Sequence, residues 1–190
     1  ANRVYARSAG RVSLAGKPDR SWNPEVFGSV LAADVDVDSE RYYAGGHFKR
    51  TKSGYANHAA ILSTRTARLD QSFEFVPSSH RGQYQQAVDV VGNRFFFGGA
   101  QHSLFGYDSS SNRRISSSIT MTNGGDMQAI THSDNGVLYA SCHCSDYSYQ
   151  DADNFDYIGE GWTRADEILW VGGWDAVTGE HLGWTPYRLS

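Results

Sequence analysis

The segment between Cys144 and Glu167 carries side chains that could bind a metal ion. Asp151, Asp153 and Asp156 alternate with other residues, and carboxylate oxygens are ligands that calcium prefers. The segment lacks the glycine at the sixth position and the glutamate at the twelfth position of an EF-hand loop. Two alternatives follow for these residues, a calcium site or a solvated acidic loop.

The triplet Cys142, His143 and Cys144 offers three soft ligands, which could hold zinc if a fourth came from elsewhere. On a strand, however, His143 points away from the face that carries both sulfurs. The Cα atoms of such a pair lie about 6.5 to 7 Å apart, at the edge of disulfide reach. We favour a buried thiol pair, and the redox compartment stays open.

Seven histidines and many carboxylates are scattered along the chain without a nucleophile elbow, a phosphate loop or a His-Glu-x-x-His motif. We therefore expect no enzyme. Several blades of a propeller can assemble a site around a central channel, and the first candidates for such a site are His47, His102 and His132. The alternative for each is a polar residue at the mouth of a channel.

Aromatic side chains are concentrated in the same long segment between Cys144 and Glu167. Exposed rings among polar groups are typical of protein-docking or sugar-stacking surfaces. The candidate binding residues are Tyr147, Tyr149, Phe155, Tyr157 and Trp162. The alternative is that these rings fold back and cover the edge of a sheet.

The composition indicates which elements must position these residues. Twenty glycines and 13% aromatic residues, with only four prolines, are typical of short strands joined by tight turns. The net charge of −4, without a basic stripe, argues against a nucleic-acid partner. No apolar run is long enough to span a membrane, and the start at Ala1 leads us to expect that upstream residues were cleaved or are not included.

A repeat organises the chain. An aromatic run enters a pair of small residues three times, at Gly45-Gly46, Gly98-Gly99 and Ser141-Cys142, with intervals of 53 and 43 residues. Each run follows another strand and a turn rich in Asp, Asn or Gly, which predicts a hairpin. The spacing fits one four-stranded propeller blade per repeat.

We therefore predict an all-β fold, a β-propeller segment of about three and a half four-stranded blades of a larger ring. Residues 1–27 form a half blade, and residues 28–79, 80–122 and 123–190 form three blades, the last with a long insertion at 145–166. Trp22, Phe73 and Trp184 precede outer turns and are expected to be anchors between neighbouring blades. A closed four-bladed disc is the rival, but two of its strands cannot be found.

The repeat resembles the actinobacterial and phage-type β-propeller repeats with the pattern Tyr-x-Gly-Gly-x-Phe, a polar loop, and Leu-Asp-x-x-Thr-Gly followed by Ser-Trp-x-Pro. The matching segments are Tyr43-Ala-Gly-Gly-His-Phe48 with Leu69-Asp-Gln-Ser-Phe73, Trp174-Asp-Ala-Val-Thr-Gly179 with Gly183-Trp-Thr-Pro186, and Asp19-Arg-Ser-Trp-Asn-Pro24. Ser141-Cys142 and Ile119 depart from the pattern. Most members of this family have no assigned activity.

The resemblance implies a non-catalytic scaffold or binding module, because such propellers occur in secreted proteins and in minor tail proteins of phages. We expect an extracellular location, in a virion tail or a secreted protein, without a cofactor unless calcium binds. The expected partners are other subunits of an assembly, or a host-surface protein or glycan. The alternative is a secreted propeller enzyme or lectin with a site in the central channel.

Overall fold

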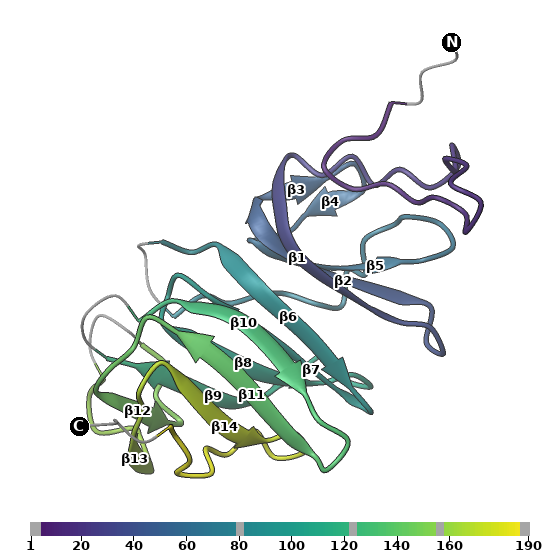
Figure 1. Cartoon of the computed structure of the whole chain (residues 1–190). Helices are drawn as coiled ribbons and strands as arrows, with labels where there is room; N and C mark the ends of the chain where they lie inside the picture. The colour runs from purple at the N-terminus through teal and green to yellow at the C-terminus, as the bar shows by residue number, and fades with distance from the viewer. Residues whose placement is uncertain (1–4, 79–81, 122–124, 155–157, 187–190) are drawn as a thin grey trace.

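The computed structural model describes residues 5–78, 82–121, 125–154 and 158–186, and these form an all-β protein built from antiparallel sheets (Figure 1). The described residues contain no helix, and hence none long and apolar enough to cross a membrane. The first sheet has the order β1-β2-β5, the second β13-β12-β9-β8-β7-β6 and the third β10-β11-β14, and β3 and β4 form a small hairpin. The strands are β1 Gly28–Asp36, β2 Arg41–Phe48, β3 Arg50–Thr51, β4 Gly54–Tyr55, β5 Ala59–Ser63, β6 Gln85–Val91, β7 Arg94–Gly99, β8 Ser103–Asp108, β9 Arg114–Thr120, β10 Met127–His132, β11 Val137–Cys142, β12 Tyr147–Gln150, β13 Arg164–Glu167 and β14 Val171–Asp175.

The first hairpin of each sheet repeats the same irregularity. A β-bulge inserts Leu31 into β1, Gln86 into β6 and Gln128 into β10, each opposite the predicted pair of small residues on the partner strand. A Cβ atom at Gly46 would collide with the backbone oxygen of Ser29, so the first bulge needs a glycine across from it. The recurrence of the bulge confirms that the three hairpins are equivalent units.

Rings fill the space between the first and second sheets. Phe73 lies beside Phe95, Phe97 and Tyr107, and the buried Tyr43 of β2 contacts Phe95 from the first sheet. The second and third sheets meet over a separate core that includes Phe96, Leu104, Leu138, Ile168 and Trp174. Each pair of neighbouring sheets is therefore joined face to face through apolar side chains.

The fourth strand of each unit differs from the prediction. Only β9, in the second sheet, is a regular fourth strand, whereas single bridges pair Leu62 with Leu69 and Trp174 with His181 in the other two sheets. Residues 5–27 contain no strand and make one bridge, from Val12 to Pro18, although two strands were expected here. Residues 1–4 of this expected half blade lie outside the described residues. Scattered backbone hydrogen bonds, such as those from Val26 to Arg7 and from Asp70 to Ile61, hold these segments in place together with side-chain packing.

The first 27 residues nevertheless repeat one local structure of the later units. Asp19 accepts hydrogen bonds from the backbone and hydroxyl of Ser21, as Asp70 does from Ser72. The following rings are both buried, since Trp22 is 3% and Phe73 is 8% exposed. Trp22 meets Tyr42 edge to face with ring centroids 5.4 Å apart, so both rings are anchors as predicted.

Trp184 behaves differently. It also meets a ring of its sheet edge to face, Tyr139 at 5.5 Å, but it remains 47% exposed. Among the described residues no further sheet lies on this side of the third sheet. The prediction of a buried anchor at Trp184 is therefore not met by the described part of the chain.

Candidate functional site

The long insertion folds into a hairpin rather than an open loop. Its strands β12 and β13 pair with each other, and β12 also pairs with β9, so that an element inserted into the third unit extends the second sheet to six strands. Figure 1 shows this hairpin at the outer side of the second sheet, next to β9. The insertion therefore covers the edge of β9, which was the alternative to a free docking loop.

Alternation along β12 places its rings on one face. Tyr147 and Tyr149 are neighbours on that face, with ring centroids 6.3 Å apart, and Trp162 meets Tyr149 edge to face at 5.5 Å. Tyr147 is 45% and Trp162 is 39% exposed, while Tyr149 is partly buried. We call these three residues the aromatic strip.

The aromatic strip contains three of the five predicted binding residues. Phe155 and Tyr157 lie outside the described residues. Tyr149 packs against the apolar core between the first and second sheets, together with Ile158 and Met121. One ring of the strip is thus fixed to the core, and the two beside it are available to a partner.

The opposite face of β12 is anchored by a buried polar network. Gln150 is 5% exposed, and its Oε1 accepts hydrogen bonds from the hydroxyl of Ser118 at 3.1 Å and from the backbone of His181 at 3.2 Å. Ser118 in turn accepts a hydrogen bond from Nε1 of the fully buried Trp174 at 2.9 Å. This network holds the hairpin against the third sheet, which gives the aromatic strip a rigid base.

The acidic residues of the insertion have separate partners. Asp151 has a positive φ of 64° and accepts a hydrogen bond from the hydroxyl of Thr163. Asp153 forms an ion pair with Arg114, with 2.5 Å between the charged atoms, and Asp156 lies outside the described residues. Within the described ranges no group of three or more His, Cys, Asp or Glu side chains could hold a metal ion. The geometry at Asp151 and Asp153 gives the calcium hypothesis no support.

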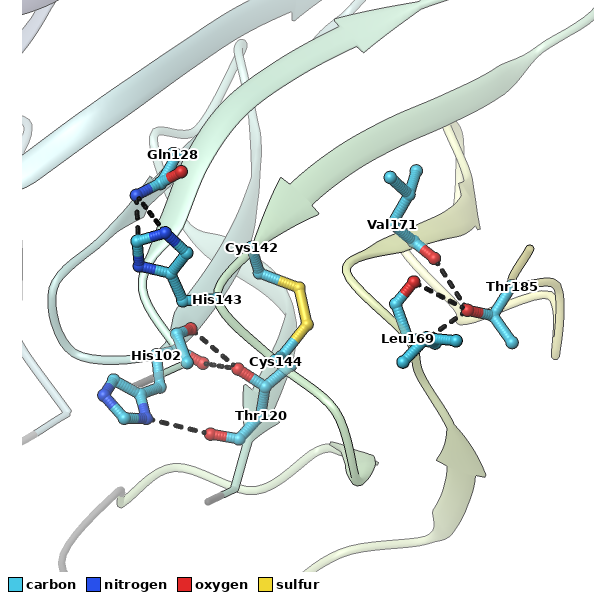
Figure 2. Close-up of a disulfide and its surroundings, with 10 residues drawn as sticks. His102, Thr120, Gln128, Cys142, His143, Cys144, Leu169, Val171 and Thr185 are labelled. Carbon is cyan, nitrogen blue, oxygen red and sulfur yellow. Dashed lines mark hydrogen bonds between the residues drawn. A yellow bond between two sulfur atoms is a disulfide. The ribbon is translucent and has the colours of Figure 1, made fainter. Parts of the chain in front are cut away.

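Cys142 and Cys144 form a disulfide, which corrects the interpretation as a thiol pair (Figure 2). Their Cα atoms are 5.2 Å apart, closer than on a regular strand, because β11 ends at Cys142. Figure 2 shows His143 turned away from the sulfurs toward Gln128, whose Nε2 is 3.3 Å from its ring nitrogens. Because the two sulfurs are bonded to each other, this structure does not offer them as zinc ligands.

Two of the three candidate histidines, His47 and His102, are linked by a chain of contacts. The linking residues, Tyr84 and Asp126, were not singled out from the sequence. His47 stacks on Tyr84 with ring centroids 3.9 Å apart, and Asp126 bonds Tyr84 and lies 3.6 Å from His102. Burial lowers the pKa of His102, although Asp126 opposes this shift. Tyr84 and Asp126 carried no repeat or motif signal, so only the fold could reveal them.

The third candidate, His132, lies at the end of β10, where Nδ1 donates to Asp89 of β6 at 2.8 Å. Burial raises the pKa of Asp89, while the hydrogen bond from His132 lowers it and the charge of Asp34 raises it further. The three histidines therefore do not form one constellation. The aromatic strip is the best-defined surface among the predicted sites.

Comparison with known proteins bears on the fold. The chain resembles the computationally designed Ika8 protein with a TM-score of 0.50 and 12% identity, over 89% of this chain and 52% of that one. It also resembles the designed Ika4 protein (TM-score 0.43, 11% identity, 60% of each chain) and the Myceliophteria thermophila Cps50 (Swd1) beta-propeller domain (TM-score 0.46, 8% identity, 67% of this chain and 37% of that one). The chain thus spans about half the length of Ika8.

No protein-family model matches the chain, and no curated protein matches it. The likeness to Ika8 concerns the fold alone, because the identity is low. The likenesses to Ika4 and to the Cps50 domain are weaker and do not assign the fold further. The all-β architecture of several antiparallel sheets stands on the strand pairing itself.

Proposed function

We propose that this chain is a run of β-propeller blades that serves as a non-catalytic binding module of an extracellular assembly. Three equivalent bulged hairpins, packed face to face through rings, support the propeller. The innermost strands β1, β6 and β10 lie next to one another, as blades around an axis require (Figure 1). The ring is larger than the three sheets described here, and residues 5–27, which contain no strand, belong to its next blade.

No described sheet covers the face of the third sheet that carries Tyr139 and Trp184, and this supports a ring with a further blade. Tyr43 and Tyr139 occupy equivalent places, two residues before the small pair, and Tyr43 is fully buried against the next sheet. Tyr139 is only partly buried and contacts the half-exposed Trp184. A further blade, or another chain of the assembly, covers these two rings in the complete ring.

The aromatic strip carries the proposal for function. Tyrosine and tryptophan are enriched in the centres of protein interfaces, because they bury a large area at a low cost in conformational entropy. Here the two exposed rings, Tyr147 and Trp162, stand beside the anchored Tyr149 on a hairpin fixed by strand pairing. The strip docks a protein partner, a neighbouring subunit of a virion tail or secreted assembly, or a protein of a host surface.

The disulfide supports the extracellular location. Disulfides persist in oxidising compartments and are rare in the reducing cytosol. Cys142 and Cys144 are both buried, so the bond lies within the third unit rather than on its surface. A secreted or virion-borne protein meets this condition.

One observation favours the second candidate, a secreted enzyme or lectin with a site in the central channel. Asp89 and His132 lie on innermost strands and are hydrogen bonded to each other. The two side chains therefore satisfy each other. A second contact of this kind joins β1 and β6, where Asp34 accepts the backbone N–H of Val90 at 2.7 Å. These contacts connect neighbouring sheets, and we therefore assign them to structure and retain the binding module.

Site-specific photo-crosslinking tests the docking role. A benzophenone amino acid replaces Tyr147 in one variant and, as control, Tyr55, which is 66% exposed and lies in the β3-β4 hairpin. After irradiation in the native assembly or on the host surface, we expect one defined partner protein to be linked through position 147 and not through position 55. Equal labelling from both positions, or no protein adduct from position 147, would refute the docking role. A crosslink to a glycan instead of a protein would mean that the aromatic strip binds sugars.

A further inference from the structure

The described part of the chain ends in two open faces, one on the first sheet and one on the third (Figure 1). On the first sheet, residues 5–27 cover β2 and β5, where Val26 joins an apolar core with Leu62. They leave β1 uncovered, since Val35 is 44% and Val37 is 78% exposed. The part of this face that β1 forms is therefore available to a partner.

A groove runs along this uncovered part, with a volume of about 400 Å³. Apolar side chains make up most of its wall, namely Val12, Trp22, Val35, Val37 and Tyr42. Val35 lies opposite Tyr42 on the partner strand, as Val90 lies opposite Phe95 in the second sheet. There Phe95 is fully buried and contacts Tyr43 of the first sheet, with ring centroids 4.8 Å apart. The groove thus has the apolar surface of a junction between sheets, without a described sheet to fill it.

The open face of the third sheet carries rings that suit this groove. Trp184 lies over Gly173 on that face and is 47% exposed, and Tyr139 is partly buried beside it. Tyr139 occupies the place equivalent to Tyr43, the ring that contacts the second sheet. Trp184 also borders a hollow of about 380 Å³ together with the exposed Glu167. This face therefore offers the kind of side chain that the groove lacks.

The two ends also carry opposite charge. Residues 1–27 contain five basic and two acidic residues, whereas residues 123–190 contain two basic and eleven acidic residues. Lys17 and Arg20 are exposed at the first end, and Glu167 borders the hollow at the other. Like ends of two copies therefore repel each other, and opposite ends attract each other.

We propose that a second copy of this chain docks on the groove, with the open face of the third sheet of one copy packed head to tail against the first sheet of the other. Tyr139 and Trp184 enter the groove beside Trp22, and the acidic end meets the basic end. The inference rests on the proposed propeller, in which head-to-tail contacts between sheets close into a ring. Two copies bring six sheets, within the range of about four to eight blades for a propeller, and a third copy would exceed that range.

Sedimentation velocity on the whole chain tests the association. The parent should have twice the 21.0 kDa mass of one chain at about 100 μM. The dimer should weaken when the salt concentration rises from about 20 mM to about 500 mM, because salt screens the attraction between the ends. A parent that stays monomeric at about 500 μM, or that forms open-ended filaments, would overturn the proposal.

Two variants, each with one damaged face, test the direction of docking. Val37→Asp places a negative charge in the groove, and Trp184→Lys replaces the ring of the third sheet by a positive charge. Each variant alone should be monomeric at about 500 μM, but an equimolar mixture should contain one-to-one dimers, because the third sheet of the first variant and the groove of the second are intact.

The matched control is Val76→Asp, which changes a valine that is 57% exposed and lines neither the groove nor the hollow beside Trp184. It should dimerise like the parent. Circular dichroism checks that all three variants are folded. Dimers of either single variant, or a mixture that stays monomeric, would contradict docking between these two faces.

The aromatic strip provides a separate readout. Tyr147 lies on the β12-β13 hairpin and lines neither the groove nor the hollow beside Trp184, so crosslinking through position 147 should be the same in monomeric Val37→Asp as in the parent. A monomeric parent that still crosslinks a partner protein would overturn the pairing of copies alone. A dimeric parent without this crosslink would overturn the docking role of the strip alone.

Discussion

Asp89 in β6 accepts a hydrogen bond from Nδ1 of His132 in β10 at 2.8 Å, and this contact joins the end strands of two neighbouring sheets. The preceding pair of sheets is joined in the same way, since Asp34 in β1 accepts the backbone N–H of Val90 in β6 at 2.7 Å. Asp34 and Asp89 occupy equivalent places, opposite Tyr43 and Phe96 on their partner strands. Polar contacts therefore join β1 to β6 and β6 to β10, in addition to the apolar packing between the sheets.

His132→Ala should lower the free energy of unfolding by about 1 to 3 kcal/mol, because the largely buried carboxylate of Asp89 loses its partner. Urea denaturation monitored by tryptophan fluorescence measures this loss. His143→Ala is the control, since this side chain is exposed and bonds to Gln128, and its removal should change stability by less than about 0.5 kcal/mol. Equal losses for both variants would show that the contact between β6 and β10 contributes nothing.

Lowering the pH should weaken the hydrogen bonds that the carboxylate of Asp70 accepts, and it should thereby destabilise the fold. Burial raises the pKa of Asp70, but hydrogen bonds from Ser72, Asn112 and Arg41 outweigh this, so the pKa lies below the ordinary value. A carboxyl with a lowered folded pKa contributes stability above its unfolded pKa, near 3.9, and this contribution is lost as the pH falls through the folded pKa.

The variant Asp70→Asn should therefore lose about 1 to 3 kcal/mol at pH 7 and should show a smaller loss of stability between about pH 5 and pH 2 than the parent. Urea midpoints across this range provide the measurement. Parallel pH profiles for parent and variant would mean that Asp70 titrates alike in the folded and unfolded chains.

Truncation of Phe73 should lower the free energy of unfolding more than truncation of Trp184. Phe73→Ala removes a ring packed among Phe95, Phe97 and Tyr107, and it should cost about 3 to 5 kcal/mol. Trp184→Ala removes a half-exposed ring and should cost about 1 kcal/mol in the isolated chain. A loss at Trp184 as large as at Phe73 would indicate that a further element covers this ring in solution.

Replacing residues 147–166 by a short Gly-Ser turn should destabilise the protein, contrary to what an open loop would predict. The replacement removes Gln150, so that Ser118 and the backbone of His181 lose their acceptor, and it exposes the edge of β9. We expect a loss of about 3 kcal/mol or more and increased aggregation, measured by denaturation and light scattering. An unchanged midpoint would mean that β12 does not pair stably with β9.

The sequence predicted the repeated hairpins because their signals are local. Turn residues such as Gly92 and Gly136 have positive φ values of 56° and 81°, and the small pairs lie opposite the three bulges. Local chemistry is enough to define such units.

Long-range contacts could not be predicted in the same way. The pairing of β12 with β9 joins segments of different units, and it depends on the open edge of β9 and on the buried hydrogen bonds of Gln150. The Cys142–Cys144 disulfide was not predicted, because the expected distance between the Cα atoms was that of a continuous strand. In the structure β11 ends at Cys142, and the two Cα atoms lie closer together.

The affinity of the crosslinked partner for the chain tests the central claim most directly. The double variant Tyr147→Ala with Trp162→Ala removes the two exposed rings and leaves Tyr149 and the pairing of β12 with β9 in place. The account predicts that the partner binds this variant at least about tenfold, or 1.4 kcal/mol, more weakly than it binds the parent, while the variant stays folded and loses no more than about 1 to 2 kcal/mol of stability. An unchanged affinity, measured by calorimetry with the folded double variant, would contradict it.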